Sequence, residues 1–109
     1  MSKQHSVCAL SDLRKSNSIG FSIDEVDGFV LIVENEARAF VNSCPHMGTN
    51  LDFVPHRFLD SAQAFIQCAM HGALFEKLTG KCVHGPCVGQ SLISLEASIV
   101  GDEVLVTIE

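Results

Sequence analysis

Cys44-Pro45-His46 and Cys68-Ala69-Met70-His71-Gly72 are the two stretches that constrain this sequence most tightly. Each offers one thiolate and one imidazole within a few residues, and the segment 47–67 separates the two. Thiolates and neutral imidazoles are the usual protein ligands of Zn²⁺ and of iron–sulfur centres. The two motifs therefore predict an inorganic site with four ligands: Cys44, His46, Cys68 and His71.

Composition predicts an ordinary globular protein. The chain has 109 residues, of which 47% are apolar, so one domain with a single core is expected. Its net charge of −6 argues against nucleic acid or an anionic membrane as the main partner, because both are polyanions. An acidic surface suits docking onto a basic patch of another protein, and a monomer is favoured.

The cysteines indicate a reducing compartment. Residues 1–10 lack an apolar stretch long enough for a secretion signal, and the longest apolar run, 29–33, is too short to cross a bilayer. A cytoplasmic location is therefore expected, where cysteines are more often thiols or metal ligands than disulfides. Cys82 and Cys87 are predicted to be free thiols rather than a second metal site, Cys8 a small core residue and His84 a solvated loop residue.

Short apolar segments divided by turn signals predict an all-β, mostly antiparallel fold. Helical periodicity sustained over three turns is absent from the sequence. Each Cys/His motif follows an expected strand, and 53–62 is expected to form a loop or a single helical turn. Turns are predicted at 24–28, 34–36 and 101–102. Strands are predicted over 6–10, 20–23, 29–33, 37–42, 64–67, 94–100 and 103–108.

The mixture of ligand types favours iron–sulfur chemistry over zinc. A structural zinc site commonly places both cysteines on one knuckle, whereas each motif here supplies one Cys and one His. This arrangement fits a two-iron cluster clamped between two loops, with both thiolates on one iron and both imidazoles on the other. Neutral imidazoles leave the cluster less negative, which raises its potential above that of all-Cys clusters. Zinc remains the alternative.

These residues resemble the signature of Rieske-type ferredoxins, C-x-H followed by C-x-x-H, which all four predicted ligands match one for one. The similarity continues at Gly48, through 72–75, and at 79–80 and 85–86, which resemble the family's third loop over the cluster. The resemblance implies a Rieske-like antiparallel β-sandwich over residues 1–109 that carries one [2Fe–2S] cluster. Two loops would form a small cluster-binding subdomain at about 43–88. The segment between the motifs is longer than is usual in the family.

The resemblance also implies a low potential within the family. Respiratory members have an extra cysteine in each cluster loop, joined as a disulfide, and place Ser and Tyr hydroxyls near the cluster. The corresponding positions here are Thr49, Met70, Ala73 and Phe75, and the sequence contains no tyrosine. Fewer hydrogen bonds to the cluster sulfurs predict a potential towards the low end of the range of about −150 to +300 mV.

Electron transfer without a substrate reaction is the function that the resemblance implies. The mononuclear iron site of Rieske oxygenases belongs to a larger C-terminal domain, for which 109 residues leave no room. The chain is expected not to be an enzyme itself, but to pass single electrons from a reductase to an oxygenase or similar terminal enzyme. His46 and His71 are expected at the exit point, with an apolar contact patch made by Met47, Leu74 and Pro86.

Two other functions stay open from the sequence. One is the electron-carrying small subunit of an NAD(P)H-dependent nitrite reductase, since proteins of that group share the fold. The other is a zinc-stabilised β module that serves only in protein interactions. Iron and sulfide content would separate the zinc module from both electron carriers.

Overall fold

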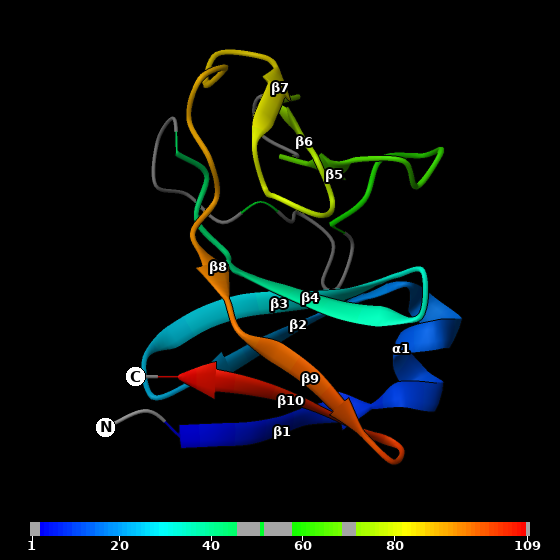
Figure 1. The fold of residues 1–109 in the computed structure, drawn as a ribbon. Helices are drawn as coiled ribbons and strands as arrows, with labels where there is room; N and C mark the ends of the chain where they lie inside the picture. Colours follow the sequence, from blue (N-terminus) through cyan, green and yellow to red (C-terminus); the bar gives the residue numbers. More distant parts are fainter. Residues whose placement is uncertain (1–2, 46–50, 52–57, 69–71, 109) are drawn as a thin grey trace.

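The computed structural model describes residues 3–45, 51, 58–68 and 72–108. Figure 1 shows three antiparallel sheets and one short helix in this part of the chain, which confirms the predicted fold class. In chain order the elements are β1 (Lys3–Ala9), α1 (Leu10–Ser16), β2 (Ser18–Ile23), β3 (Val26–Val33), β4 (Glu36–Val41), β5 (Ile66–Gln67), β6 (Leu74–Phe75), β7 (Cys82–His84), β8 (Ser94–Leu95), β9 (Ala97–Val100) and β10 (Glu103–Ile108).

Two of the sheets form a sandwich. One has the strand order β1-β10-β9 and the other β2-β3-β4-β8, and they lie face to face in the lower half of Figure 1. The space between them is filled by side chains spaced two residues apart, because alternate side chains of a strand point to the same face. The buried members of this cluster are Leu13, Val30, Ala37, Ala39, Val104, Val106 and Ile108.

The third sheet, β5-β6-β7, lies on the opposite face of the β2-β3-β4-β8 sheet (Figure 1). Phe29 and Leu31 of β3 and Phe40 of β4 point towards it, while Val30 of β3 points into the sandwich. The middle of β3 is thus buried on both faces. This explains why 29–33 is apolar without alternation, as is typical of strands covered on both sides.

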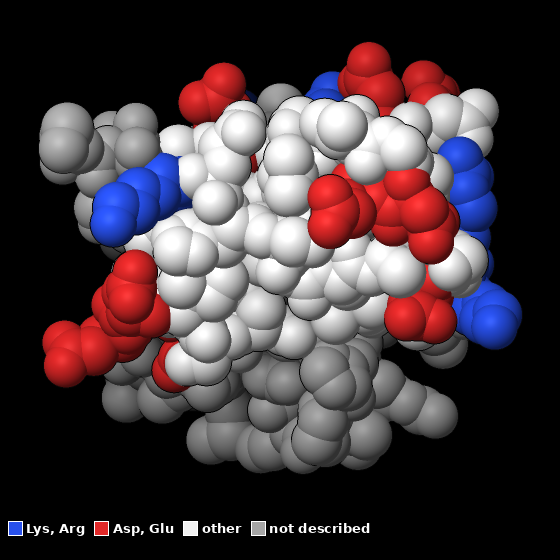
Figure 2. Space-filling model, turned by 90° about the horizontal axis from the view of Figure 1, so that it is seen from below, with Lys and Arg blue, Asp and Glu red and all other residues white. Residues whose placement is uncertain are grey.

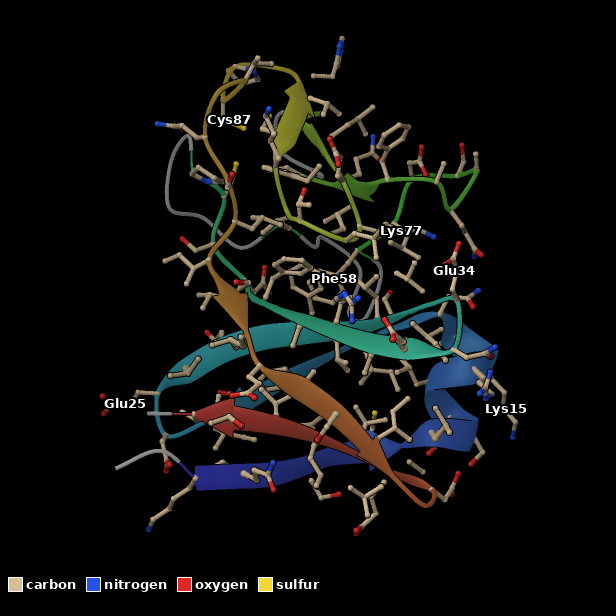
Figure 3. The ribbon with its side chains drawn as sticks, viewed as in Figure 1. Lys15, Glu25, Glu34, Phe58, Lys77 and Cys87 are labelled. Carbon is tan, nitrogen blue, oxygen red and sulfur yellow. The ribbon has the colours of Figure 1, made fainter. Side chains whose placement is uncertain are left out.

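The Phe58 ring joins the third sheet to the sandwich (Figure 3). It stacks on Phe29 with ring centroids 4.3 Å apart and an angle of 8° between the planes, and it is only 1% exposed. Gly20 of β2 makes room for it, since a Cβ at that position would lie 3.2 Å from the ring. Phe58 is therefore the aromatic bridge between the two halves of the molecule.

The hairpin turns differ in detail from the prediction. Asp24-Glu25 and Glu34-Asn35 both adopt two consecutive positive φ angles, which suits two-residue hairpins. Gly28, predicted to serve the first turn, lies inside β3 instead. A Cβ there would be 2.5 Å from the Phe21 ring and 3.0 Å from the Phe40 carbonyl oxygen. Gly28 is needed for the space that Phe21 occupies across the strand pair.

Three other boundaries also differ. The first predicted strand ends at Ala9, and α1 begins at Leu10; seven residues are too few to show sustained helical periodicity. The predicted strand 94–100 is divided at Glu96, where the chain leaves one sheet for the other. In the segment 53–62, residues 53–57 lie outside the described part, and the rest forms no helix.

No helix in the described part of the chain has the length and apolar character needed to cross a bilayer.

Replacing Phe58 with Ala should lower the free energy of unfolding by about 3–5 kcal/mol, because it removes a fully packed ring and leaves a cavity against Phe29. Urea denaturation followed by circular dichroism measures this. Leu78→Ala is the matched control, since Leu78 is a turn residue of the same half and is 54% exposed. Its effect should stay within about 0.5 kcal/mol, and equal losses for the two variants would contradict the bridging role of Phe58.

Candidate metal centre

The two predicted cysteine ligands lie in one core cluster. Cys44 follows β4, Cys68 follows β5 directly, and both side chains are fully buried beside Phe29 and Phe75. His46 and His71 lie outside the described residues. Within the described residues alone, no group of three or more His, Cys, Asp or Glu side chains is arranged to hold a metal ion. The fold therefore brings together the thiolate half of the predicted donor set, which suits a thiophilic centre.

Asn42 ties the first cysteine loop closed. Its side-chain Oδ1 accepts a hydrogen bond of 2.7 Å from the Leu51 N–H, and its own N–H donates to the Asp27 carbonyl at 2.8 Å. Asn42 is 8% exposed and Leu51 is fully buried, so the hydrogen bond between them is shielded from water. It joins the two ends of the loop that contains Cys44. The sequence analysis missed Asn42. Its signal in the sequence is its position two residues after Phe40, where the alternation of β4, if continued by one residue, places a polar side chain on the buried side.

The second cysteine loop closes on itself through the main chain. The Gly72 N–H donates to the Cys68 carbonyl, and the Cys68 N–H donates to the Ala73 carbonyl, both at 2.9 Å. Gly72 has a φ of +67°, a backbone conformation that favours glycine. Ala73 and Phe75, which stand where the resemblance expects hydroxyls, are both fully buried. These two positions offer the site no hydroxyl donor.

A third loop, which runs from β7 to Gln90, packs against the second. A Cβ on Gly85 would lie 2.8 Å from the Ala73 Cα, so the two main chains are in close contact there. The Cys82 N–H donates to the Gln90 carbonyl, and the Gln90 N–H donates to the Cys87 carbonyl, both at 2.9 Å. The loop is therefore held at its base and packs closely against the main chain at Ala73.

Four sulfur atoms lie buried in this half of the molecule. Cys82 and Cys87 belong to the same cluster as Cys44 and Cys68, and none of these four cysteines is in a disulfide. The Cys87 Sγ lies 3.0 Å from the Cys82 Sγ. Burial raises the pKa of Cys87 to about 12, with further contributions from the neighbouring Cys82 and Cys44 thiols. Cys87 thus lies beside Cys82, in the cluster that also holds the two predicted cysteine ligands.

The remaining predicted positions are as follows. His84 is exposed, as expected, and Cys8 is half-buried against the sandwich core. Of the predicted contact patch, Pro86 is exposed and Leu74 half-buried, while Met47 lies outside the described residues. Burial, with a smaller effect of Asp12, raises the pKa of Cys8.

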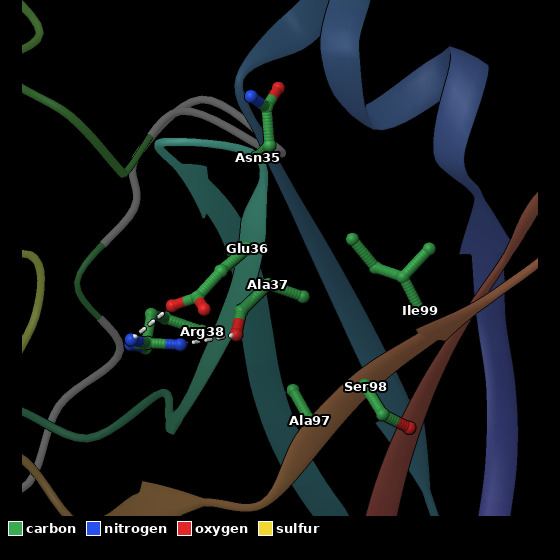
Figure 4. Close-up of a pocket in the computed structure, with 7 residues that line it drawn as sticks. All are labelled: Asn35, Glu36, Ala37, Arg38, Ala97, Ser98 and Ile99. Atoms are coloured by element: carbon green, nitrogen blue, oxygen red, sulfur yellow. Dashed lines mark hydrogen bonds and ion pairs between the residues drawn. The ribbon is translucent and has the colours of Figure 1, made fainter.

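The pocket of about 240 Å³ in Figure 4 is unrelated to the cysteines. It lies between β4 and β9, and its lining includes Ala37, which packs in the sandwich core rather than in the cysteine cluster. Its charged side chains, Arg38 and Glu36, already form an ion pair with 2.8 Å between Nη2 and Oε2. Figure 2 shows that the opposite end of the molecule has an uncharged centre with both acidic and basic groups near its rim. Neither feature resembles a metal site.

Comparisons with known proteins agree with this geometry. Among curated proteins, cholesterol 7-desaturase of Caenorhabditis elegans is 29% identical over 82 residues; the match covers 72% of this chain and 18% of that protein. The ferredoxin of carbazole 1,9a-dioxygenase from Nocardioides aromaticivorans IC177 superposes with a TM-score of 0.78 at 24% identity, covering 95% of this chain and 96% of that one. The Sphingomonas yanoikuyae B1 ferredoxin gives 0.76 at 18% identity, covering 98% and 100%.

The family model for the Rieske [2Fe–2S] domain matches residues 3–104, which is nearly the whole chain. The cofactor that this family model describes is a [2Fe–2S] cluster, and the two buried thiols of Cys44 and Cys68 suit it. The chain belongs to the Rieske [2Fe–2S] domain family.

Proposed function

We propose that this protein carries single electrons through one [2Fe–2S] cluster held by Cys44, His46, Cys68 and His71. The main support is the shared burial of Cys44 and Cys68, which approach from β4 and β5 and meet in one apolar cluster. Two thiolates and two imidazoles are the donor set of Rieske centres. The imidazole half of the set is inferred from the spacing of the sequence motifs.

The chain's own residues hold the thiolates in place. Hydrogen bonds join Asn42 to Leu51 and Cys68 to Gly72 and Ala73, at the described ends of the two loops. Apolar neighbours such as Phe29 and Phe75 keep water from the cysteine side of the site. The bound cluster supplies one-electron chemistry, and burial of both thiols limits the solvent rearrangement that a change of charge requires.

The partners we propose are redox proteins: a reductase that donates electrons and an oxygenase or similar terminal enzyme that accepts them. The likeness to the ferredoxin of a dioxygenase supports this choice. Val83 and Val88, which are 42% and 62% exposed, lie with the exposed Pro86 on the third loop and form an apolar contact surface. The net charge of −6 would steer a basic partner.

The likeness to cholesterol 7-desaturase favours a second candidate. The chain spans 18% of that protein, so a unit of this kind can be one part of a larger enzyme. As the second candidate, this chain would serve as the electron-carrying part of a larger enzyme, and the group that accepts its electrons would belong to that same enzyme. Identifying the proteins that co-purify with this chain separates the two candidates.

Anaerobically purified protein should contain two irons and two sulfides per chain and be red-brown. Its reduced form should give an EPR spectrum with a low average g value, as mixed Cys and His ligation requires. Replacing His46 or His71 with Ala should abolish this spectrum, because each change removes one of the two nitrogen ligands. Iron analysis, visible absorption and EPR of the purified variants provide the test.

The matched control is His84→Ala, since His84 is exposed in the same half of the molecule and is not a proposed ligand. This variant should keep its iron and its EPR signal. A colourless wild-type protein that contains zinc would overturn electron transfer and leave a zinc-stabilised module. A spectrum that survives loss of His46 or His71 would show that the ligands are wrongly assigned.

The midpoint potential should lie towards the low end of the range of about −150 to +300 mV for Rieske centres. Ala73 and Phe75 are buried beside Cys68 and carry no hydroxyl that could donate to a cluster sulfur. Redox titration monitored by absorption measures the potential. A value near the top of that range would contradict this account.

Gly85→Ala should reduce the iron retained by the purified protein, because a Cβ there meets the Ala73 main chain and lifts the third loop from the second. Gly89→Ala is the control for backbone strain. Gly89 also has a positive φ, +97° against +105° for Gly85, but a Cβ there meets no atom within 4 Å. Equal iron loss in both variants would attribute the effect to strain rather than to contact between the loops.

A further inference from the structure

Cys82 and Cys87 are a pair of thiols that the proposed cluster does not use. Their Sγ atoms lie 3.0 Å apart, and each side chain is 1% exposed. A disulfide requires about 2.05 Å between the sulfurs, so a movement of about 1 Å would join them. The other two thiols of this apolar cluster, Cys44 and Cys68, are the proposed ligands.

The main chain holds the two cysteines close together. Cys82 donates its N–H to the Gln90 carbonyl and Cys87 accepts from the Gln90 N–H, so both are tied to the same residue. Between them lie only four residues, Val83 to Pro86, which turn at the surface with Gly85 at a φ of +105°. A small movement of this loop, rather than of a sheet, would bring the sulfurs together.

We infer that Cys82 and Cys87 form a reversible disulfide that closes the third loop, with a low-molecular-weight disulfide such as oxidised glutathione as the oxidant. Movement of the surface segment 83–86 exposes the Cys82 sulfur, which attacks the oxidant, forming a mixed disulfide and releasing one thiol. Burial raises the pKa of Cys87, so Cys87 is the cysteine that reacts second. The second cysteine sulfur then attacks the first, forming the Cys82–Cys87 bond and releasing the other thiol. Two protein thiols lose two electrons and two protons, and the oxidant becomes two thiols.

The pair also lies in the same buried cluster as the proposed ligands Cys44 and Cys68. The Cys87 S–H donates to the Cys82 Sγ, so thiol protons lie within this cluster. Such protons near a cluster's ligand sulfurs stabilise the reduced form, and the disulfide has none. Closure of the loop should therefore lower the midpoint potential. This consequence depends on the proposed ligand role of Cys44, whereas the disulfide itself does not.

Tryptic peptides test the disulfide directly. No Lys or Arg follows Lys81, so Cys82 and Cys87 share the peptide 82–109, while Cys8, Cys44 and Cys68 fall in 4–14, 39–57 and 58–77. Cluster-loaded protein is incubated anaerobically with oxidised glutathione, alkylated in denaturant, digested and analysed by mass spectrometry. Peptide 82–109 should lose both alkylation sites together and regain them after dithiothreitol, while the other three peptides remain alkylated.

Several results would overturn the inference. These are that peptide 82–109 keeps both alkyl groups, that it carries glutathione without the internal bond, or that it becomes linked to 39–57 through Cys44. Cys82→Ser and Cys87→Ser should each abolish the internal bond, and Cys8→Ser, outside this cluster, should leave it unchanged. In a redox titration, the cluster of the wild-type protein should have a lower midpoint potential when Cys82 and Cys87 form a disulfide than when both are thiols. An unchanged potential with the disulfide present would overturn the coupling to Cys44 and leave only the cross-link.

Discussion

The stack of Phe58 on Phe29 is the contact on which the arrangement of this molecule depends. Phe29 belongs to the strand that is covered on both faces, and Phe58 belongs to the half that contains Cys44, Cys68, Cys82 and Cys87. The sandwich on one side of that strand has a core of its own. The third sheet has strands of only two or three residues, too short to be stable alone. Its position, and that of Cys68, is therefore set by packing onto the β2-β3-β4-β8 sheet.

The sequence was sufficient for the fold class and for the family, and the two cysteines predicted as ligands lie in one buried cluster. Short apolar segments and turn residues located most of the strands, and the C-x-H and C-x-x-H motifs identified the family that the comparison confirms. Each of these features depends only on residues close together in the sequence, so each can be predicted without knowing the rest of the fold. The division of 94–100 into β8 and β9 is not local, because it depends on which sheet each part of the strand can reach.

Gly28 and Asn42 show why the remaining details were out of reach. The first was assigned to a turn because glycine is common there, yet it is needed because the Phe21 ring lies across it. The second is an ordinary strand-end asparagine until Leu51 is found at its Oδ1. The role of each residue depends on a contact with another segment of the chain. The same holds for Cys82 and Cys87, whose spacing matched no known ligand set and whose 3.0 Å approach appears only in the folded chain.

The closure of the first cysteine loop by Asn42 has a consequence for how the protein tolerates acidity. An amide neither gains nor loses a proton in the physiological range, so the bond from the Leu51 N–H to Oδ1 persists where a carboxylate acceptor would be neutralised. The geometry around Cys44 therefore does not change with the uptake or release of protons that often accompanies electron transfer. Slow deamidation of Asn42 to aspartate would make this hydrogen bond depend on pH and would place a titratable group in the interior.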